Sequence, residues 1–266
     1  MILAGVLGDP IAHSLSPKLH GHWLARLGID GAYVPLHVRP EDLADALRLL
    51  PRLGFRGVNV TIPHKAAALV ASAHVTDRAR RIGAANTLTF AEDGLHADNT
   101  DAPGFLANLD AAGPWDAERP AVVLGAGGAA RAIVVALQDR GVPRIRLANR
   151  TRARAEALAA EFGGIDVAPL DDPGLRDAGL VVNTTALGMA GQPPLALDLA
   201  PLPPDAVVTD IVYAPLDTPL LQAAAARGLR TVDGLGMLLH QAAPGFRRWF
   251  GADPVVDDAL RAAVLA

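Results

Sequence analysis

A glycine-rich turn between an apolar segment and a helix-like segment constrains the fold of this chain most. The apolar residues Ala121–Leu124 predict a buried strand, and Gly125-Ala126-Gly127-Gly128-Ala129-Ala130 follows directly. In such a G-x-G-x-x-A turn the first glycine reverses the chain, the second lets the backbone approach a pyrophosphate, and the last small residue lets helix pack on strand. The helix N-terminus adds free N–H groups and a positive dipole end. The turn therefore predicts dinucleotide binding, and a glycine-rich turn without a ligand is the alternative.

Hydrophobic patterns predict two successive runs of alternating strands and helices. In the first run we expect strands over 2–7, 33–38, 57–61, 86–90 and 95–97, and helices over 16–27, 40–50, from Pro63 onward and over 102–112. In the second run we expect strands over 121–124, 145–148, 180–183, 207–212 and 229–232, and helices over 129–140, 152–162, 218–227, 235–250 and 254–266. Such alternation predicts an α/β protein with open, mostly parallel sheets.

Single residues add detail to three of these elements. Ser16 is expected to cap the first helix, with Pro17 at its first helical position. Asp93-Gly94 predicts the turn of a hairpin. Pro244 lies inside the expected helix 235–250 and predicts a kink or a split there, because proline lacks the N–H of the helical hydrogen bond.

The end of the second strand after the glycine-rich turn distinguishes between cofactors. NAD sites usually place a carboxylate there for the ribose hydroxyls. This chain instead has Asn149-Arg150-Thr151, followed by Arg152 and Arg154. A carboxylate would repel a 2′-phosphate, whereas arginine offers it a planar set of donors. The segment therefore favours NADP over NAD, and the alternative is a solvated helix start that happens to be rich in arginine.

A lysine and an aspartate end two separate motifs upstream of the turn. Lys65 ends Gly57-Val58-Asn59-Val60-Thr61-Ile62-Pro63-His64-Lys65, and Asp101 ends Asn99-Thr100-Asp101. Lys65 falls in the first turn of an expected helix, where the dipole disfavours its positive charge and favours use as an acid or base. Taken alone, Lys65 could be an exposed surface lysine and Asp101 a helix cap. Next to a dinucleotide site, the pair indicates that a proton moves beside the cofactor.

The chain resembles the shikimate dehydrogenase family along its whole length. The motifs that carry this resemblance are 8–17 followed by His20, 57–65, 83–88, 99–101, 125–131, 149–151, 183–189, 210–215, 218–221, and 234–237 with Gln241 and Ala242. No single motif is decisive, but all of them in this order are specific. The resemblance implies reversible, NADPH-dependent reduction of 3-dehydroshikimate to shikimate in aromatic amino acid biosynthesis.

The resemblance also implies a role for individual residues. Lys65 would be the general acid and base, with Asp101 beside it on the substrate hydroxyls. Ser14 and Ser16 would hold the substrate carboxylate. The other substrate-binding residues would be Thr61, Asn86, Tyr213 and Gln241. The cofactor would contact Asp77, Gly125, Ala126, Gly127, Gly128, Ala129, Asn149, Arg150, Thr151, Arg154, Ile211, Gly234 and Met237.

The same resemblance implies two domains with the active site in the cleft between them. We expect a substrate-binding and catalytic domain from 1–101 with 236–266, and a Rossmann-like NADP domain from 102–235. The nearest alternative function is a quinate or dual quinate/shikimate dehydrogenase. A cofactor-binding sensor without catalysis is a further alternative, which the presence of both Lys65 and Asp101 argues against.

Composition argues against several other classes of protein. The net charge of −4 gives no reason to expect a nucleic-acid partner. There is no cysteine, which excludes disulfides and thiolate metal sites and fits a reducing compartment. The first residues contain no basic leader and no stretch is long and apolar enough for a membrane span, so we expect a cytoplasmic protein that is a monomer or homodimer. His20 and His22 lie two apart on a helix, so we expect no metal in the site.

Overall fold

The computed structural model describes residues 1–266, which form two compact units. Unit 1 comprises Met1–Gly104 and Leu238–Ala266, and unit 2 comprises Phe105–Met237. The chain therefore passes between the units after Gly104 and after Met237, in helices α5 (Asp101–Ala111) and α9 (Leu235–Phe250). Both units are α/β, as predicted from the alternation of strands and helices. No helix has the length and apolarity needed to span a membrane.

The sheet of unit 1 has six strands in the order β2-β1-β3-β5-β6-β4. The strands are β1 (Ile2–Gly8), β2 (Gly31–His37), β3 (Phe55–Val60), β4 (His74–Val75), β5 (Thr87–Ala91) and β6 (Gly94–Asp98). Strand β5 runs antiparallel to both of its neighbours, and all other pairs are parallel. The predicted hairpin at Asp93-Gly94 joins β5 to β6, and Gly94 adopts the positive φ of +129° that this turn needs.

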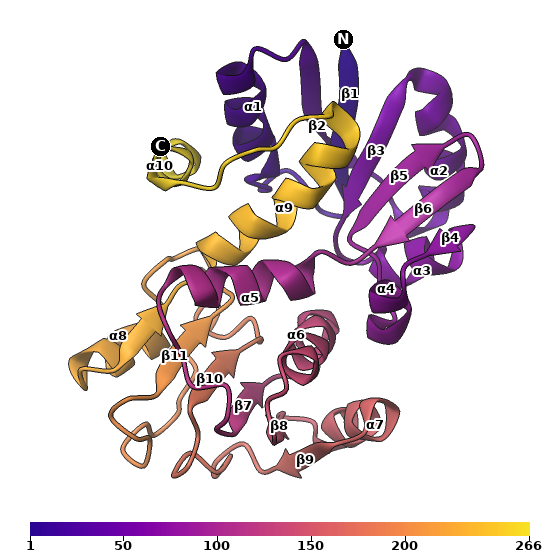
Figure 1. The fold of residues 1–266 in the computed structure, drawn as a ribbon. Helices are drawn as coiled ribbons and strands as arrows, with labels where there is room; N and C mark the ends of the chain where they lie inside the picture. The colour runs from indigo at the N-terminus through magenta and orange to yellow at the C-terminus, as the bar shows by residue number, and fades with distance from the viewer. The chain divides into compact units, whose positions relative to one another are not determined.

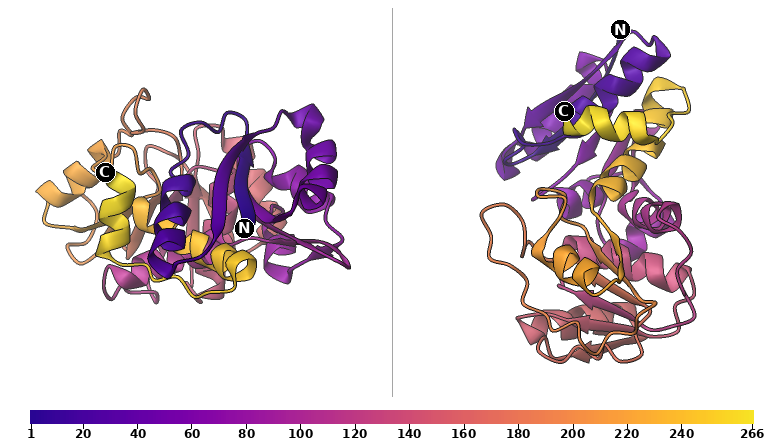
Figure 2. Two further views of the ribbon diagram at one scale, coloured as in Figure 1. Left: turned by 90° about the horizontal axis from the view of Figure 1, so that it is seen from above. Right: turned by 90° about the vertical axis from the view of Figure 1, so that its left-hand side faces the viewer.

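The helices of unit 1 cover this sheet and include the C-terminal segment of the chain. They are α1 (Ser16–Leu27), α2 (Leu43–Leu49) between the 3₁₀ turns 40–42 and 50–53, α3 (Lys65–Val70), α4 (Asp77–Ile82), the part of α9 from Leu238, and α10 (Asp258–Leu265). Helix α10 packs beside α1 although the two lie far apart in the sequence (Figures 1 and 2). The Trp23 indole N–H donates to the Val255 carbonyl at 2.8 Å, and Arg26 pairs with Asp257 at 2.6 Å.

Unit 2 has a six-stranded sheet in which every pair of neighbours is parallel. The order is β12-β11-β10-β7-β8-β9, with β7 (Ala121–Leu124), β8 (Ile145–Ala148), β9 (Ile165–Ala168), β10 (Leu180–Asn183), β11 (Val207–Asp210) and β12 (Arg230–Val232). Its own helices are α6 (Gly128–Asp139), α7 (Arg152–Phe162) and α8 (Pro219–Ala226), which follow β7, β8 and β11 (Figure 1). This strand order is the Rossmann order, so the predicted fold class of unit 2 is confirmed.

Four expectations about local structure were wrong or incomplete. Ser16 does not cap α1, because Leu15 is the N-cap in helical conformation, and Ser16 is already the first helical residue. Pro63 does not open α3, because a turn in which the His64 N–H donates to the Thr61 carbonyl delays the helix to Lys65. The expected helix 40–50 is divided into a 3₁₀ turn and α2. The short elements β4, α4 and β9 were not predicted, since two to six residues carry too little periodicity.

Pro244 neither splits nor ends helix α9, which runs unbroken from Leu235 to Phe250. An internal proline costs a helix about 3 kcal/mol. The residues after it, Phe246 and Trp249, are nearly fully buried, and each such side chain contributes about 1.5–3 kcal/mol. Burial of the last two turns therefore offsets the lost backbone hydrogen bond.

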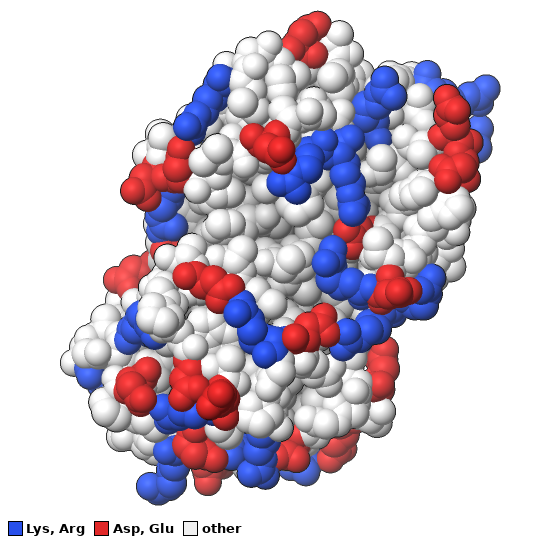
Figure 3. All heavy atoms as spheres, in the orientation of Figure 1, with Lys and Arg blue, Asp and Glu red and all other residues white.

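Charged side chains of both signs are mixed over the protein surface. On the face drawn in Figure 3, aspartate and glutamate alternate with lysine and arginine, and no broad area carries one sign. Many of these charges form surface ion pairs, such as Arg144 with Asp166 and Arg152 with Glu156.

A buried histidine lies in an aromatic cluster of unit 1. His20 of α1 is fully buried and stacks on Tyr33 with ring centroids 3.8 Å apart, and Trp23, Phe246 and Trp249 surround the pair. Neither ring nitrogen has a hydrogen-bond partner. Burial lowers the pKa of His20 from 6.5 to about 3, because the cationic form has no solvation in this cluster.

This burial predicts a pH-dependent loss of stability on the acid side. The folded-state pKa of His20 lies below its unfolded value. The stability linked to neutral His20 is therefore fully present above pH 6.5 and is lost as the pH falls towards 3. Replacing His20→Phe should keep the stacking and remove about 1.4 kcal/mol per pH unit from the slope of unfolding free energy between pH 6 and 4. Urea unfolding, followed by tryptophan fluorescence at several pH values, measures this slope for the wild type and for the variant. Equal slopes would refute the assignment of the pH dependence to His20.

Candidate active site

Lys65 and Asp101 form an ion pair beyond the carboxyl ends of strands β3 and β6 of the unit 1 sheet. Lys65 is the first residue of α3, and Asp101 is the first residue of α5. The Lys65 Nζ lies 2.6 Å from Asp101 Oδ2, and both side chains are largely shielded from solvent. The backbone holds each partner in place, since the Ala85 N–H donates to the Lys65 carbonyl and the Asp101 N–H donates to Asn99 Oδ1. The sequence placed these two residues in separate motifs, and the fold brings them into contact.

Lys65 is also unusual in the composition of this chain. The sequence has 24 lysine and arginine residues, of which only Lys18 and Lys65 are lysine. An arginine keeps its charge at all accessible pH values, whereas a lysine can lose and regain a proton. A partly buried lysine, in a chain that otherwise uses arginine almost throughout, favours a role in proton exchange. This count is a signal that the motif analysis did not use.

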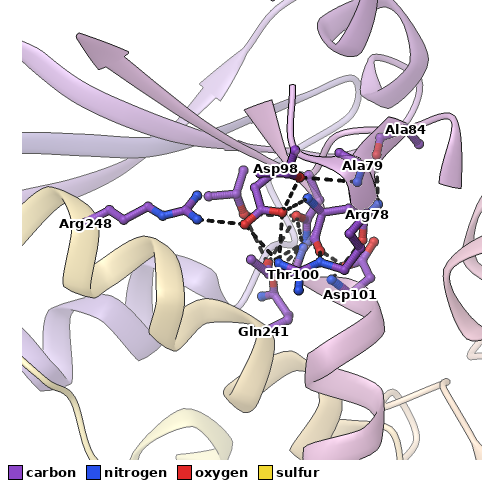
Figure 4. A network of polar contacts seen from close by, with 12 residues as sticks. Arg78, Ala79, Ala84, Asp98, Thr100, Asp101, Gln241 and Arg248 are labelled. Carbon is purple, nitrogen blue, oxygen red and sulfur yellow. Dashed lines mark hydrogen bonds and ion pairs between the residues drawn. The ribbon is translucent and has the colours of Figure 1, made fainter. Parts of the chain in front are cut away.

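Asn86 connects the ion pair to helix α9. Its amide nitrogen donates to Asp101 Oδ1 at 2.7 Å, to Thr100 Oγ1 at 3.0 Å and to Gln241 Oε1 at 3.2 Å. Its side-chain oxygen, Oδ1, accepts from the Thr100 backbone N–H at 2.7 Å. Each carboxylate oxygen of Asp101 therefore has one fixed donor, Lys65 on one side and Asn86 on the other. Figure 4 shows Thr100, just before α5, close to Asp101 at the start of α5 and Gln241 of α9.

A second branch of the network reaches helix α1. The Tyr33 hydroxyl donates to Asn59 Oδ1 at 2.6 Å, and the Asn59 amide donates to the Asn86 carbonyl at 3.1 Å. Burial raises the pKa of Tyr33 well above its ordinary value, and a hydrogen bond with the nearly buried Ser16 acts in the opposite direction. Ser16 is thus joined through Tyr33 and Asn59 to the residues around Lys65. Sequence reasoning did not identify Tyr33, which carries no recognisable motif.

The loop before Asp101 is held by a buried carboxylate that sequence reasoning also missed. Asp98, at the end of β6, is about 1% exposed and accepts from Arg78 at 2.9 Å and from Arg248 at 2.8 Å (Figure 4). It also accepts from Thr76 Oγ1 and from the Asn99 N–H. Burial acts to raise the pKa of Asp98, but the two arginines and these hydrogen bonds outweigh it and hold the pKa below its ordinary value. Asp98 therefore stays ionised and fixes the start of the Asn99-Thr100-Asp101 segment.

Four further residues predicted to bind substrate or cofactor lie outside this network. Ser14 Oγ accepts from the Ser16 N–H at 3.3 Å, so it belongs to the turn that precedes α1. Thr61 follows β3 and packs its methyl group where a side chain on Gly8 would be. Asp77 is exposed at the start of α4, where it pairs with Arg80 at 2.6 Å. Tyr213 belongs to unit 2 and is partly buried after β11.

The glycine-rich turn of unit 2 has the geometry that a pyrophosphate requires. Gly125 has a φ of +109°, and a Cβ there would lie 2.5 Å from Thr184 Oγ1, so only glycine fits between β7 and β10. A Cβ on Gly127 or Gly128 would meet nothing within 4 Å, so there is open space beside the start of α6, where the first N–H groups of a helix have no partner within the helix. Ala130 is fully buried, as expected for the residue that packs helix on strand. Ala126 and Ala129 complete this turn.

Two arginines at the end of β8 have no ion-pair partner. Arg150 and Arg154 are exposed, whereas Arg152 between them pairs with Glu156 at 2.8 Å. The Asn149 amide donates to the Thr151 carbonyl at 2.8 Å, which shapes the loop without adding a negative charge. The residues present therefore fit a dinucleotide with an additional phosphate: open N–H groups for the pyrophosphate, and uncommitted cations where the second ribose is expected.

Three more residues predicted to contact the cofactor lie after β11 and β12. A Cβ on Gly234 would lie 2.3 Å from the Ile211 carbonyl, so the two predicted residues touch and glycine is required. The buried Asp210 anchors this loop by accepting from Asn183 at 3.0 Å, from Thr218 at 2.8 Å and from the Val212 N–H. Burial raises the pKa of Asp210, and these hydrogen bonds act against the rise. Met237 lies in the first turn of α9.

The two units together define a class of protein. Unit 1 carries a partly buried lysine–aspartate pair in a polar network, and unit 2 carries a Rossmann sheet with a glycine-rich turn, a combination typical of a dinucleotide-dependent oxidoreductase. Family models match residues 6–88 (shikimate dehydrogenase substrate binding domain), 113–187 (shikimate / quinate 5-dehydrogenase) and 234–264 (shikimate 5'-dehydrogenase C-terminal domain). The chain belongs to the shikimate dehydrogenase family, as the motifs predicted.

Relatives and solved structures resemble the chain over nearly its whole length. The shikimate dehydrogenase (NADP(+)) of Jannaschia sp. (strain CCS1) is 62% identical over 271 residues, covering 99% of this chain and 97% of that protein. The structure of shikimate 5-dehydrogenase from Thermus thermophilus, in complex with NADP(H) and shikimate, is 42% identical with a TM-score of 0.91 and covers 100% and 99%. Quinate dehydrogenase from Corynebacterium glutamicum, in complex with NAD, is 32% identical with a TM-score of 0.91 and covers 99% and 98%.

Proposed function

We propose that this protein is an NADP-dependent shikimate dehydrogenase, which reversibly reduces 3-dehydroshikimate to shikimate for aromatic amino acid biosynthesis. The observation that carries the proposal is the Lys65–Asp101 pair, 2.6 Å apart and bonded through Asn86 to Gln241. A pair of this kind moves a proton at an oxygen atom of a bound polyol. Family membership and the 62% identity to a curated shikimate dehydrogenase support the same substrate.

The polar side chains of unit 1 match the chemistry of shikimate, a small ring with one carboxylate and several hydroxyls. We assign the carboxylate to the hydroxyls of Ser14 and Ser16, with Thr61 and Tyr213 as further donors. Asn86, Asp101 and Gln241 are already bonded to one another and offer fixed donors and acceptors for the ring hydroxyls. Buried groups of this kind reject analogues that lack a hydroxyl, because they would be left unpaired.

Lys65 is the group that exchanges a proton with the substrate. In the reducing direction its ammonium donates a proton to the carbonyl oxygen of 3-dehydroshikimate, and in the oxidising direction its neutral amine accepts the proton of the shikimate hydroxyl. Asp101 orients the Lys65 amine through the 2.6 Å contact, and the hydrogen bond from Asn86 orients Asp101. NADP supplies the hydride chemistry when bound.

The cofactor is held by unit 2. The N–H groups of 126–129 bind the pyrophosphate, while Gly125, whose N–H donates to the Ala148 carbonyl, turns the chain. Arg150 and Arg154 bind the 2′-phosphate, with Asn149 and Thr151 shaping the loop. Ile211, Gly234 and Met237 line the nicotinamide side. Asp77 of unit 1 is assigned to the same side by family resemblance. We further expect a cytoplasmic enzyme, in keeping with the absence of cysteine, that is a monomer or homodimer and acts on small molecules only.

The direct test is an absorbance assay at the nicotinamide band with the purified full chain. Shikimate and quinate are each oxidised with NADP and with NAD, and kcat/KM is compared over the four combinations. We expect shikimate with NADP to give the highest value. A higher value for quinate would instead make the protein a quinate dehydrogenase, a class to which one structural relative belongs. No turnover with either substrate would favour a cofactor-binding sensor.

The acid–base role predicts how substitutions of Lys65 behave. Both Lys65→Ala and Lys65→Arg should lower kcat by roughly 100-fold or more, because neither side chain can donate and regain a proton. The arginine variant separates proton transfer from simple charge stabilisation, since it keeps the positive charge. Lys18→Arg is the matched control, since it alters the only other lysine, which is exposed on α1, and should turn over normally. Substantial activity in Lys65→Arg would show that Lys65 acts only as a cation.

The unpaired arginines predict a cofactor-specific effect. Arg150→Ala should lower kcat/KM for NADP more than about tenfold, since a charge-assisted contact contributes about 1.5–3 kcal/mol. Arg154→Ala should cost less, and kinetics with NAD should hardly change in either variant. Arg152→Ala is the matched control, because Arg152 is already paired with Glu156. Equal losses with NADP and NAD would mean that Arg150 supports the loop and does not read the phosphate.

A further inference from the structure

Two histidines and an aspartate meet at the edge of the unit 1 sheet. His74 lies on β4, His96 lies on β6, and Asp93 lies in the turn between β5 and β6. The His96 Nε2 is 2.8 Å from Asp93 Oδ1, and the His74 Nε2 is 3.4 Å from Asp93 Oδ2. One possible ligand atom from each residue lies within 4.8 Å of the others. Neither the catalytic network nor the cofactor turn uses any of these three residues.

The backbone arrangement holds the three side chains together. His74 and His96 are direct register partners in the parallel pair β4·β6, so both side chains leave the same face of the sheet. Their rings lie 4.4 Å apart between centroids. Asp93 is placed by the tight turn at Gly94, where a Cβ would lie 2.9 Å from the Ala73 Cβ. The cluster is therefore a product of strand register and turn geometry.

The donor atoms and their spacing suit a borderline transition metal ion. Imidazole nitrogen and carboxylate oxygen are both ligands of Zn²⁺, at about 2.0–2.2 Å in tetrahedral geometry. Two ligands at those lengths lie about 3.4 Å apart, as do His74 Nε2 and Asp93 Oδ2. His96 Nε2 contacts the other oxygen of Asp93 at 2.8 Å, and one ligand atom from each of the three residues lies within 4.8 Å of the others. Small rotations of these exposed side chains are enough to bring all three ligand atoms to a single ion. Two histidines and one carboxylate also leave a fourth position for water, as open zinc sites do.

The surroundings of the cluster allow a cation to enter. His74 and His96 line a pocket of about 400 Å³ together with Thr76, Thr89 and Arg248. Arg248 in this lining is positively charged and would repel a cation, but its guanidinium is paired with Asp98 at 2.8 Å. The three side chains are themselves 40–63% exposed, so a cation and its water ligands can reach them from solvent.

We propose that His74, Asp93 and His96 form a zinc-binding site on the edge of the unit 1 sheet. Bound Zn²⁺ links β4, which is only two residues long, to the β5–β6 hairpin, and so stabilises this edge. The site is separate from the proposed chemistry, and removal of zinc leaves shikimate oxidation intact. The proposal therefore holds or fails independently of the proposed function.

The test is zinc titration of the full, untagged chain after dialysis against a chelator. Isothermal calorimetry should show one Zn²⁺ per chain, and zinc should raise the melting temperature. The double variant His74→Gln, His96→Gln should bind at least roughly tenfold more weakly, the scale of loss for residues that hold a metal site. Its melting temperature should not respond to zinc. A double variant that binds zinc as tightly as the wild type would overturn the proposal.

A matched control and a second variant keep the result decisive. His37 is an exposed histidine that pairs with a single carboxylate, Asp9, at 2.7 Å, without a second histidine. His37→Gln should bind zinc like the wild type, and loss of binding there would refute the assignment. Asp93→Asn leaves both imidazoles and the turn in place, so it provides the measurement if the double variant does not fold. It should weaken zinc binding, and unchanged affinity would contradict a role for Asp93.

Discussion

The buried contact among Lys65, Asp101 and Asn86 is the interaction on which the rest of unit 1 depends. A charged pair taken out of water is costly unless each remaining donor and acceptor is satisfied. Here one carboxylate oxygen accepts from Lys65 and the other from Asn86, and Asn86 is in turn held by Thr100. The sheet, the start of α3 and the start of α5 must all be in register for these bonds to form. The same requirement explains why Asp98, with two arginines, fixes the segment that leads to Asp101.

Unit 2 solves a different physical problem, the close approach of a backbone to a phosphate. Gly125 and Gly234 are required by contacts of 2.5 and 2.3 Å that any Cβ would make, whereas Gly127 and Gly128 leave open space. Gly125 and Gly234 thus allow close packing within the chain, whereas Gly127 and Gly128 leave room for a ligand. The buried Asp210 adds a fixed anchor beneath the loop that carries Ile211. Proton exchange and cofactor binding are therefore assigned to separate units, each with its own sheet and core.

Use of arginine for nearly all cations makes the chemistry easier to recognise. Surface arginines such as Arg152 and Arg144 are paired with carboxylates, whereas Arg150 and Arg154 are not. Lys65 is one of two lysines in the chain and the only one in the polar network. A side chain that can release a proton, in a chain that otherwise avoids it, is a compositional sign of function.

The amino-acid sequence by itself determined the fold class, the family and most members of the polar network. Alternation of apolar segments predicts two α/β units because strands and helices have different periods, and the glycine-rich turn predicts the Rossmann order because few other turns need such small residues. It could not reveal Tyr33 or Asp98, which carry no motif, or the contacts of Asn59, which lies within the 57–65 motif; all three matter through partners distant in the chain. It also predicted a kink or a split at Pro244, where α9 runs on without a split, and took Ser16 for a cap. Tertiary packing decided both, because the burial of Phe246 and Trp249 and the helical conformation of Leu15 outweigh local preference. The cluster of His74, Asp93 and His96 likewise exists only through strand register, which a sequence does not state.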